Sequence, residues 1–354
     1  MMTTNGKSVR ARECFVASVI LLIIVLWLFS RSVTLDLQTI LGRSTTQGQN
    51  SRTPSTSFYH ESPENTHSGA SGRNKSCTRL LLIVIFNWPN LQHVPFIHKL
   101  YGEAVTKIVY YSDEENRNLG VHRVGLSEGA FQHVAISDAM RCYPDFDGYL
   151  WIADDIFFNY PAVFSRRNFS NVWTYPYEQP VLSLNLTKEA SKVPYTRWGK
   201  PWGMAAAKES YRCTPMKYKD RFLSRLACRD CMVKGGSDIG YVPRRLVPVF
   251  MELSYVYRHV FFEIAIPTML RVMVGSVNSD IETFQNGLYI WGPFSQKADK
   301  ARRLWKVENA FVHSTKYSNP AQKADAVRWM ADSRKKFMNV PATSRVCSVS
   351  TVKG

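Results

Sequence analysis

The sequence predicts an α/β domain, a three-layer sandwich around a parallel sheet, behind an amino-terminal transmembrane anchor. Strand-like and helix-like segments alternate from Leu80 to the two adjacent acids Asp154 and Asp155. Such alternation is typical of a parallel sheet covered by helices on both faces. The anchor is indicated by Phe15–Phe29, a run of apolar residues and one serine that carries no charge. The acids end the third strand, where a sheet of this kind binds its ligands.

The apolar run is shorter than the roughly 20 residues of an average membrane-spanning helix. Arg12 and Arg31 flank it and can reach the headgroups, and a short span suits the thin membranes of the early secretory pathway. A cleaved signal peptide is the alternative, but no small-x-small cleavage site follows directly. We therefore expect a cytosolic tail at 1–14 and an uncleaved anchor at 15–30, with the remaining chain in the lumen.

The segment after the anchor is rich in Ser, Thr, Gly and Asn and has little to bury. We expect a flexible lumenal stem at 31–76 and a catalytic domain at 77–345. Three glycosylation sequons agree with a lumenal body. They begin at Asn74, Asn168 and Asn185.

Six cysteines follow the anchor, and an even number in an oxidising compartment predicts disulfides. Cys228 and Cys231 could instead form a redox pair or half of a zinc site, although no second close pair completes such a site. The six are Cys77, Cys142, Cys213, Cys228, Cys231 and Cys347.

The formal net charge of the chain is +17. Behind a membrane anchor, this charge favours nucleotide phosphates, acidic glycans or anionic headgroups over nucleic acid as partners. A merely basic surface is the simpler interpretation. The hydrophobic content of 45% excludes wholesale disorder.

The first half of the domain alternates in a regular order. The apolar run Leu80–Phe86 has the composition of a strand covered on both faces. The next predicted elements are a helix over Asn90–Tyr101 limited by Pro95, a strand over Lys107–Tyr111, a helix over Ser127–Tyr143 and a strand over Tyr149–Asp154.

The stretch Gly148–Asn159, GYLWIADDIFFN, is the centre of the functional prediction. Two carboxylates side by side in a buried position repel each other unless a cation neutralises them. Asp154 and Asp155 therefore indicate a site for Mn2+ or Mg2+, ions that keep positions open for phosphate oxygens. The simpler interpretation is a solvated turn.

Strands over Val172–Tyr175 and Val181–Leu186 come next, followed by a loop that contains Trp198 and Trp202. Exposed indoles stack on sugar rings, whereas buried indoles fill cores, and both interpretations remain open for this loop. A glycine-rich turn then brings the backbone close to a ligand or forms a plain loop. Its residues of interest are Gly235, Gly236 and Asp238.

An apolar helix is predicted over Phe250–Arg271. His259 and Glu263 are four residues apart and would share one helix face. In a cleft, apolar neighbours would raise the pKa of Glu263 and make it a base; an internal hydrogen bond is the alternative. We expect Pro267 to kink or end the helix just past the acid.

A short strand ends near His313, and Pro320–Phe337 has the pattern of an amphipathic helix. Because His313 follows its strand as Asp154 does, it could complete a metal shell, with Lys316 facing phosphate. A purely structural role is the alternative for His313.

The ordered set of anchor, stem, acid pair, glycine pair, acid and histidine resembles the GT-A glycosyltransferases, type II membrane enzymes of the Golgi. GYLWIADDIFFN, HVFFEIAIPT and AFVHSTKYS are similar to a poorly characterised eukaryotic group in that class. The resemblance implies a GT-A-like, Rossmann-like fold, a nucleotide-sugar donor, UDP-linked in the usual case, and a glycan or glycoconjugate acceptor. It also allows a homodimer.

The resemblance also implies roles for single residues. Metal ligands would be Asp154, Asp155 and His313, catalytic residues would be Glu263 and Asp238, and cofactor-binding residues would be Asp154, Asp155, Gly235, Gly236 and Lys316. The two glycines and Asp238 would line the sugar or acceptor side.

The chain departs from the usual motifs at two places. Ala153 stands where a strict DxD triplet has its first acid, and Ser314 and Thr315 replace Pro-Val after the histidine. Two further hypotheses follow: a non-catalytic glycan-binding or enzyme-partner subunit, and a metal-dependent phosphohydrolase. The donor sugar, the acceptor and the stereochemistry are not set by these motifs.

Overall fold

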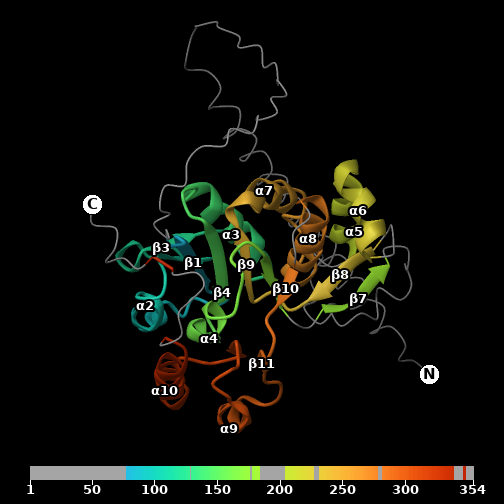
Figure 1. Cartoon of the computed structure of the whole chain (residues 1–354). Helices are drawn as coiled ribbons and strands as arrows, with labels where there is room; N and C mark the ends of the chain where they lie inside the picture. Colours follow the sequence, from blue (N-terminus) through green and yellow to red (C-terminus); the bar gives the residue numbers. More distant parts are fainter. Residues whose placement is uncertain are drawn as a thin grey trace, which may run out of the picture. The chain divides into compact units, whose positions relative to one another are not determined.

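The computed structural model describes residues 77–127, 129–175, 178–183, 204–226, 231–277, 281–338 and 346–347. The strands of its main sheet are β1 (Leu80–Ile85), β2 (Lys107–Ser112), β3 (Val121–Arg123), β4 (Gly148–Ala153), β6 (Val172–Thr174), β9 (Ile239–Pro243) and β10 (Ile281–Thr283). Their spatial order is β10-β6-β9-β4-β1-β2-β3 (Figure 1). Strand β9 runs antiparallel to its neighbours β4 and β6, while the other pairs are parallel. The predicted α/β fold is confirmed, and the sheet that was predicted to be parallel is parallel apart from β9.

Strand β1 explains the continuous apolar run in the sequence. It pairs in parallel with β2 on one side and β4 on the other, and all six of its side chains are completely buried. Because side chains alternate across a strand, the strand supplies two separate cores. Leu80, Leu82 and Val84 enter one core, and Leu81, Ile83 and Ile85 enter the other.

Helices cover both faces of the sheet, as the three-layer prediction requires. The first core takes side chains from α2 (Val94–Tyr101), α4 (Tyr160–Phe164) and α10 (Pro320–Phe337). The second takes them from α3 (Gln132–Cys142), α7 (Val247–Val256) and α8 (Phe262–Val277). Both sets are visible around the sheet in Figure 1.

Several predicted elements match closely and others are shifted. The terminal helix has the predicted bounds, Pro320–Phe337, and Asn319 caps it by accepting bonds from two backbone N–H groups. Helix α2 begins at Val94 because Pro95 is tolerated in a first turn, after a short 3-10 turn, η1 (Leu91–His93). Strand β7 (Glu178–Ser183) begins three residues before the predicted strand.

The predicted single helix over Phe250–Arg271 is wrong. The structure has two helices there, α7 and α8, which a turn after Val256 separates. His259 lies exposed in that turn and shares no helix face with Glu263, which is in the first turn of α8. Pro267 lies inside α8 without ending it, because burial of the apolar residues around it outweighs one missing hydrogen bond.

Two smaller sheets complete the described structure. Strands β5 (Ile156–Phe158), β11 (Leu288–Tyr289) and β12 (Phe311–His313) form one, in the order β11-β12-β5, and β7 pairs with β8 (Cys231–Gly235) in the other. The remaining helices are α5 (Met204–Cys213), α6 (Met216–Leu226) and α9 (Phe294–Leu304), with 3-10 turns η2 (Arg117–Leu119) and η5 (Arg244–Leu246).

The cysteines are only partly paired. Cys77 and Cys347 form a disulfide that joins the start of the described chain to its end, and Cys231 is also disulfide-bonded. Cys142 and Cys213 are free and exposed, so the prediction that all six pair is wrong for these two. Cys228 lies outside the described residues.

The predicted anchor at 15–30 and the stem at 31–76 lie outside the described residues, and so do Asn74, Asn185 and the loop with Trp198 and Trp202. Within the described ranges, no helix is both long enough and apolar enough to cross a membrane.

Candidate active site

The acid pair occupies a two-residue turn between β4 and β5. Asp154 and Asp155 are each only 8% exposed, so the interpretation as a solvated turn is wrong. The Asp154 N–H donates to the Ile85 carbonyl at 2.9 Å, and the Asp155 carbonyl accepts from the Thr315 N–H at 2.6 Å. The backbone of the turn is therefore fixed to β1 on one side and to the segment after β12 on the other.

Strand pairing brings His313 and Lys316 to Asp155. Strand β12 runs antiparallel to β5, with His313 opposite Ile156. Lys316 Nζ lies 2.6 Å from Asp155 Oδ2, and His313 Nε2 lies 3.4 Å from Asp155 Oδ1. Three of the predicted site residues therefore meet, although about 160 residues of sequence separate the acid from the lysine.

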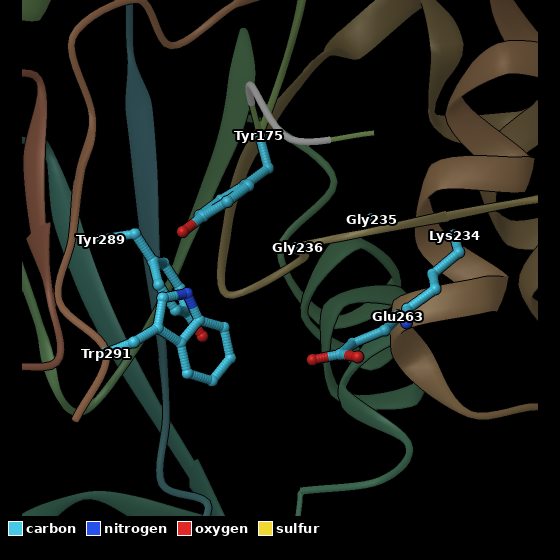
Figure 2. A pocket seen from close by; sticks show the side chains of 7 residues that line it. All are labelled: Tyr175, Lys234, Gly235, Gly236, Glu263, Tyr289 and Trp291. Carbon is cyan, nitrogen blue, oxygen red and sulfur yellow. The ribbon is translucent and has the colours of Figure 1, made fainter. Parts of the chain in front are cut away.

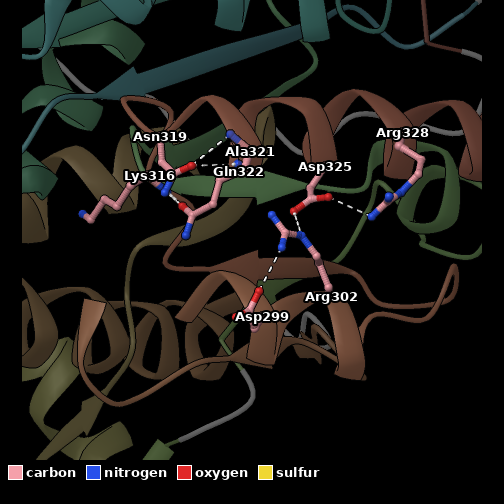
Figure 3. Close-up of polar contacts among 8 residues, drawn as sticks. All are labelled: Asp299, Arg302, Lys316, Asn319, Ala321, Gln322, Asp325 and Arg328. Atoms are coloured by element: carbon pink, nitrogen blue, oxygen red, sulfur yellow. Dashed lines mark hydrogen bonds and ion pairs between the residues drawn. The ribbon is translucent and has the colours of Figure 1, made fainter. Parts of the chain in front are cut away.

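The start of α10 fixes Lys316 (Figure 3). The Lys316 N–H donates to Gln322 Oε1, and the Asn319 side chain caps the same turn of helix. One helical turn further, the buried Asp325 accepts from Arg302 Nε at 2.6 Å and from Arg328 Nη2 at 2.8 Å. Because Arg302 belongs to α9, this ion pair ties α10 to α9 and holds the lysine loop in place.

The two adjacent acids have opposite pKa shifts. Burial alone would raise the pKa of Asp155, but His313 and the Lys316 ammonium outweigh burial and hold the pKa below its usual range. Burial raises the pKa of Asp154 to about 7, and the charge of Asp155 adds to that rise. The pair therefore favours a negative charge on Asp155 and a proton on Asp154.

The donor atoms of this cluster fit a divalent ion only in part. Among the described residues, no group of three or more His, Cys, Asp or Glu side chains is arranged to hold a metal ion. Asp155 Oδ1, however, is buried without a hydrogen-bond partner in that part of the chain, and His313 Nε2 lies beside it. Since Mg2+ and related ions bind through one or two side chains plus phosphate oxygens, Asp155 and His313 suit an ion that arrives with a diphosphate.

Asp238 and Glu263 form a second acidic group. The Asp238 carbonyl accepts from the Ala153 N–H at 2.7 Å, which holds it against the end of β4. Burial, the largest cause, raises the pKa of both acids, and that of Glu263 reaches about 7 with a further contribution from Asp238. An acid with a pKa near neutrality is suited to accept a proton from substrate.

Two cavities meet at Glu263. The larger has a volume of about 440 Å³ and is lined by Tyr175, Lys234, Gly235, Gly236, Glu263, Tyr289 and Trp291 (Figure 2). The smaller measures about 220 Å³ and shares Glu263, Tyr289 and Trp291 with it. Asp238 and His313 line the smaller cavity. Other residues of its lining follow β1 or belong to the loop before α3. Glu263 therefore has access to both spaces.

The predicted glycine pair, Gly235 and Gly236, lines the larger cavity. At Gly236, the close packing of a neighbouring side chain also requires a glycine. A Cβ at Gly236 would lie 2.4 Å from the ring of Tyr175. The glycine thus lets an aromatic ring pack against the backbone and so shapes the wall of the cavity.

Three aromatic residues at the site are not predicted from the sequence: Trp88, Tyr289 and Trp291. Trp291 is 72% exposed and Trp88 is 56% exposed. Tyr289 lies between Trp291 and His313, with ring centroids 4.4 Å and 4.5 Å away. A signal was present: Tyr289 and Trp291 alternate with the buried Ile290, as expected for an extended segment with one face in the core.

No protein-family model matches the chain, and no curated protein matches it. Several solved structures are similar to it, among them two glycosyltransferases. A glycosyltransferase involved in glycosylation of the major capsid of PBCV-1 is 8% identical with a TM-score of 0.37, over 71% of this chain and 99% of that one. The apo structure of the bifunctional glycosyltransferase WbbM is 12% identical with a TM-score of 0.36, over 77% of this chain and 54% of that one. Likenesses at this level assign neither a family nor an activity.

Proposed function

We propose that the chain is a glycosyltransferase of GT-A-like fold that moves a sugar from a nucleotide-sugar donor to a hydroxyl group of a glycan, glycoprotein or glycolipid. The observation that carries the proposal is the pairing of two acidic groups with opposite character beside two neighbouring cavities: His313, the neighbour of Asp155, lines the smaller cavity, and Glu263 lines both. Asp155 is an ionised carboxylate that pairs with Lys316 and His313. Glu263 instead has a pKa of about 7.

The smaller cavity is the proposed donor side. It lies where β1 ends, the edge at which parallel α/β sheets bind nucleotides, and His313 and Asp238 line it. Asp155 and His313 would hold Mn2+ or Mg2+ together with phosphate oxygens, with Asp154 beside them in the same turn, and Lys316 would contact the diphosphate, which we expect to belong to UDP. Such an ion, when bound, stabilises the negative charge of the leaving diphosphate. The Lys316 ammonium, which Asp155 holds at 2.6 Å, acts on the same charge.

The larger cavity is the proposed acceptor side. Its polar wall carries Glu263, with Lys234 and the glycine pair beside it. In an inverting reaction, the Glu263 carboxylate takes the proton of the attacking hydroxyl at one of its oxygens. In a retaining reaction, the same group orients the sugar. Burial holds the pKa of Glu263 high, and the neighbouring charge of Asp238 adds to that rise.

We also propose a Golgi location, with a single-pass anchor at 15–30 and the described domain in the lumen. The Cys77–Cys347 disulfide supports an oxidising compartment. Asn168, the first residue of a sequon, is exposed after α4, where an oligosaccharide could be attached.

The test is thermal unfolding of the full-length chain in detergent, with Mn2+ or Mg2+ and each of UDP, GDP, ADP and CDP. A nucleotide at about a hundred times its dissociation constant stabilises by roughly 2.7 kcal/mol. We expect a metal-dependent shift with one nucleotide that Asp155→Ala abolishes and that Asp145→Ala, a change at an acid with a side chain 79% exposed, leaves intact. No shift with any nucleotide, or an undiminished shift in Asp155→Ala, would refute the donor site. Turnover of a nucleotide sugar that acceptors never affect would instead indicate a hydrolase.

A further inference from the structure

The Trp291 indole is mostly exposed to solvent, so it contributes little to the hydrophobic core. Its side chain is 72% exposed, although it lines both cavities beside Glu263. A tryptophan usually stabilises a protein by burying its large apolar surface. An indole that remains in water on a cavity wall, next to a group suited to proton transfer, indicates a surface that a ligand covers.

The indole is held in a defined place. The Tyr289 ring supports it at a centroid distance of 4.4 Å, and Tyr289 itself packs on His313 and, edge-on, on Tyr175. The Ile290 N–H between the two aromatic residues donates to the His313 carbonyl at 2.6 Å. Trp291 is therefore anchored to the strand that carries His313, so its position is coupled to that of the donor side.

Figure 2 shows the Trp291 indole and the Glu263 carboxylate pointing toward each other across the larger cavity. Its volume of about 440 Å³ is within the usual range for small-molecule sites. The space thus combines a flat apolar wall with a carboxylate that can accept a hydrogen bond from a hydroxyl group.

A pyranose ring has the matching chemistry, because it presents a face of C–H groups and a rim of hydroxyls. Resting on the proposed function, we propose that Trp291 is the stacking platform for the pyranose ring of the acceptor, which directs one rim hydroxyl to Glu263. The acceptor is then a glycan or glycoside that ends in a pyranose, recognised mainly by shape and stacking.

Trp88 provides a matched control. Its indole is also strongly exposed, at 56%, but it lines the smaller cavity and is not among the residues of the larger one. Stacking of an acceptor sugar should depend on Trp291 and be indifferent to Trp88. A nucleobase also stacks on indoles, and in the smaller cavity it could contact Trp88, so UDP binding is measured separately.

The experiment is saturation-transfer NMR on the full-length chain in a detergent without a sugar headgroup. The probes are methyl pyranosides of gluco, galacto and manno configuration, and UDP is measured in parallel with Mn2+. We expect transfer to the C–H groups of one ring face for at least one glycoside. Trp291→Ala should weaken its binding on the order of tenfold, Trp291→Phe should retain most of it, and Trp88→Ala should leave it unchanged.

Each other outcome is decisive. Glycoside binding that Trp291→Ala leaves intact, or that only Trp88→Ala reduces, overturns the platform. The platform is also overturned if a protein that binds UDP gives no glycoside signal. It is overturned as well if Trp291→Ala reduces only the binding of UDP, because the nucleobase would then stack on this indole. Glycoside binding that needs Trp291 in a protein that binds no nucleotide keeps the platform and refutes the proposed transferase.

Discussion

Asp155 and Glu263 are both largely removed from water at the same edge of the sheet, yet their pKa values move in opposite directions. Burial acts on both in the same sense and favours the neutral acid. Asp155 differs because Lys316 and His313 contact it directly. Glu263 instead has a second acid, Asp238, as a neighbour.

The comparison shows that burial raises the pKa of an acid unless a cationic partner in direct contact outweighs it. Asp155 stays ionised and is suited to hold positive charge against a diphosphate. Glu263 exchanges its proton near neutral pH and is suited to act on a hydroxyl group. Four predictions from three substitutions break or sharpen this contrast, and they are taken from the largest expected effect to the smallest.

Glu263→Gln should lower the rate of sugar transfer by roughly 10²- to 10⁴-fold, the usual contribution of a general base. Nucleotide binding should be unchanged, because Asp155, His313 and Lys316 are untouched. The measurement is kcat for transfer beside the nucleotide-induced thermal shift, with Glu103→Gln as the control, since that side chain is 83% exposed. Equal transfer rates in the two variants would remove Glu263 from the reaction.

Lys316→Met should destabilise the fold at pH 7 by about 1–3 kcal/mol. The value is below that for breaking a fully buried ion pair, because the Lys316 side chain is 35% exposed. A lowered folded-state pKa means that Asp155 contributes stability above its unfolded pKa of about 3.9, and that this is lost as the pH falls through the folded value. Urea unfolding at pH 7 and pH 3 should therefore show a difference from wild type that shrinks in acid. Lys335→Met, at an exposed lysine of α10, should have little effect at either pH.

Glu263→Gln should also stabilise the protein at pH 8, by about 1–3 kcal/mol after allowance for partial exposure. The folded-state pKa of Glu263, about 7, is above its ordinary value of 4.5. Its contribution to stability is thus complete below pH 4.5 and is lost as the pH rises through 7. Denaturation curves at pH 4 and pH 8 should differ for wild type and much less for the variant. A variant that is no more stable at pH 8 would contradict the raised pKa.

Gly236→Ala tests whether the cavity wall depends on the packed Tyr175 ring. The added methyl group would approach that ring to 2.4 Å, so we expect a loss of about 1–3 kcal/mol in unfolding free energy. Gly125→Ala is the control, since a Cβ there meets no atom within 4 Å. If both variants unfold at the same denaturant concentration, the close packing at Gly236 is not what fixes this wall.

Elements whose signals lie in consecutive residues can be predicted from the sequence. The run Leu80–Phe86 and the terminal helix Pro320–Phe337 were predicted closely, because burial on two faces and helical periodicity are written in consecutive residues. The insertion of antiparallel β9 between β4 and β6 was not predicted, since strand pairing joins segments far apart in the sequence. The break between α7 and α8 was missed because both sides of it are apolar.

The site was predicted unevenly for the same reason. Chemistry alone marked Asp155 and Glu263 as acids in apolar stretches, whereas the meeting of Asp155 with His313 depends on the pairing of β5 with β12. Exposure is the hardest property to predict: Trp291 has the same sequence character as the buried Trp173. Only the cavity beside it shows that the two indoles differ.

The most direct test of the contrast is the titration of Glu263 itself. With glutamate labelled by ¹³C at the side-chain carboxyl carbon, the resonance that disappears in Glu263→Gln identifies this residue in the spectrum of the full-length chain. We predict that its chemical shift titrates with a pKa of about 7. A midpoint at the ordinary value of 4.5 would contradict the account, because Glu263 would then be no different from an acid in water.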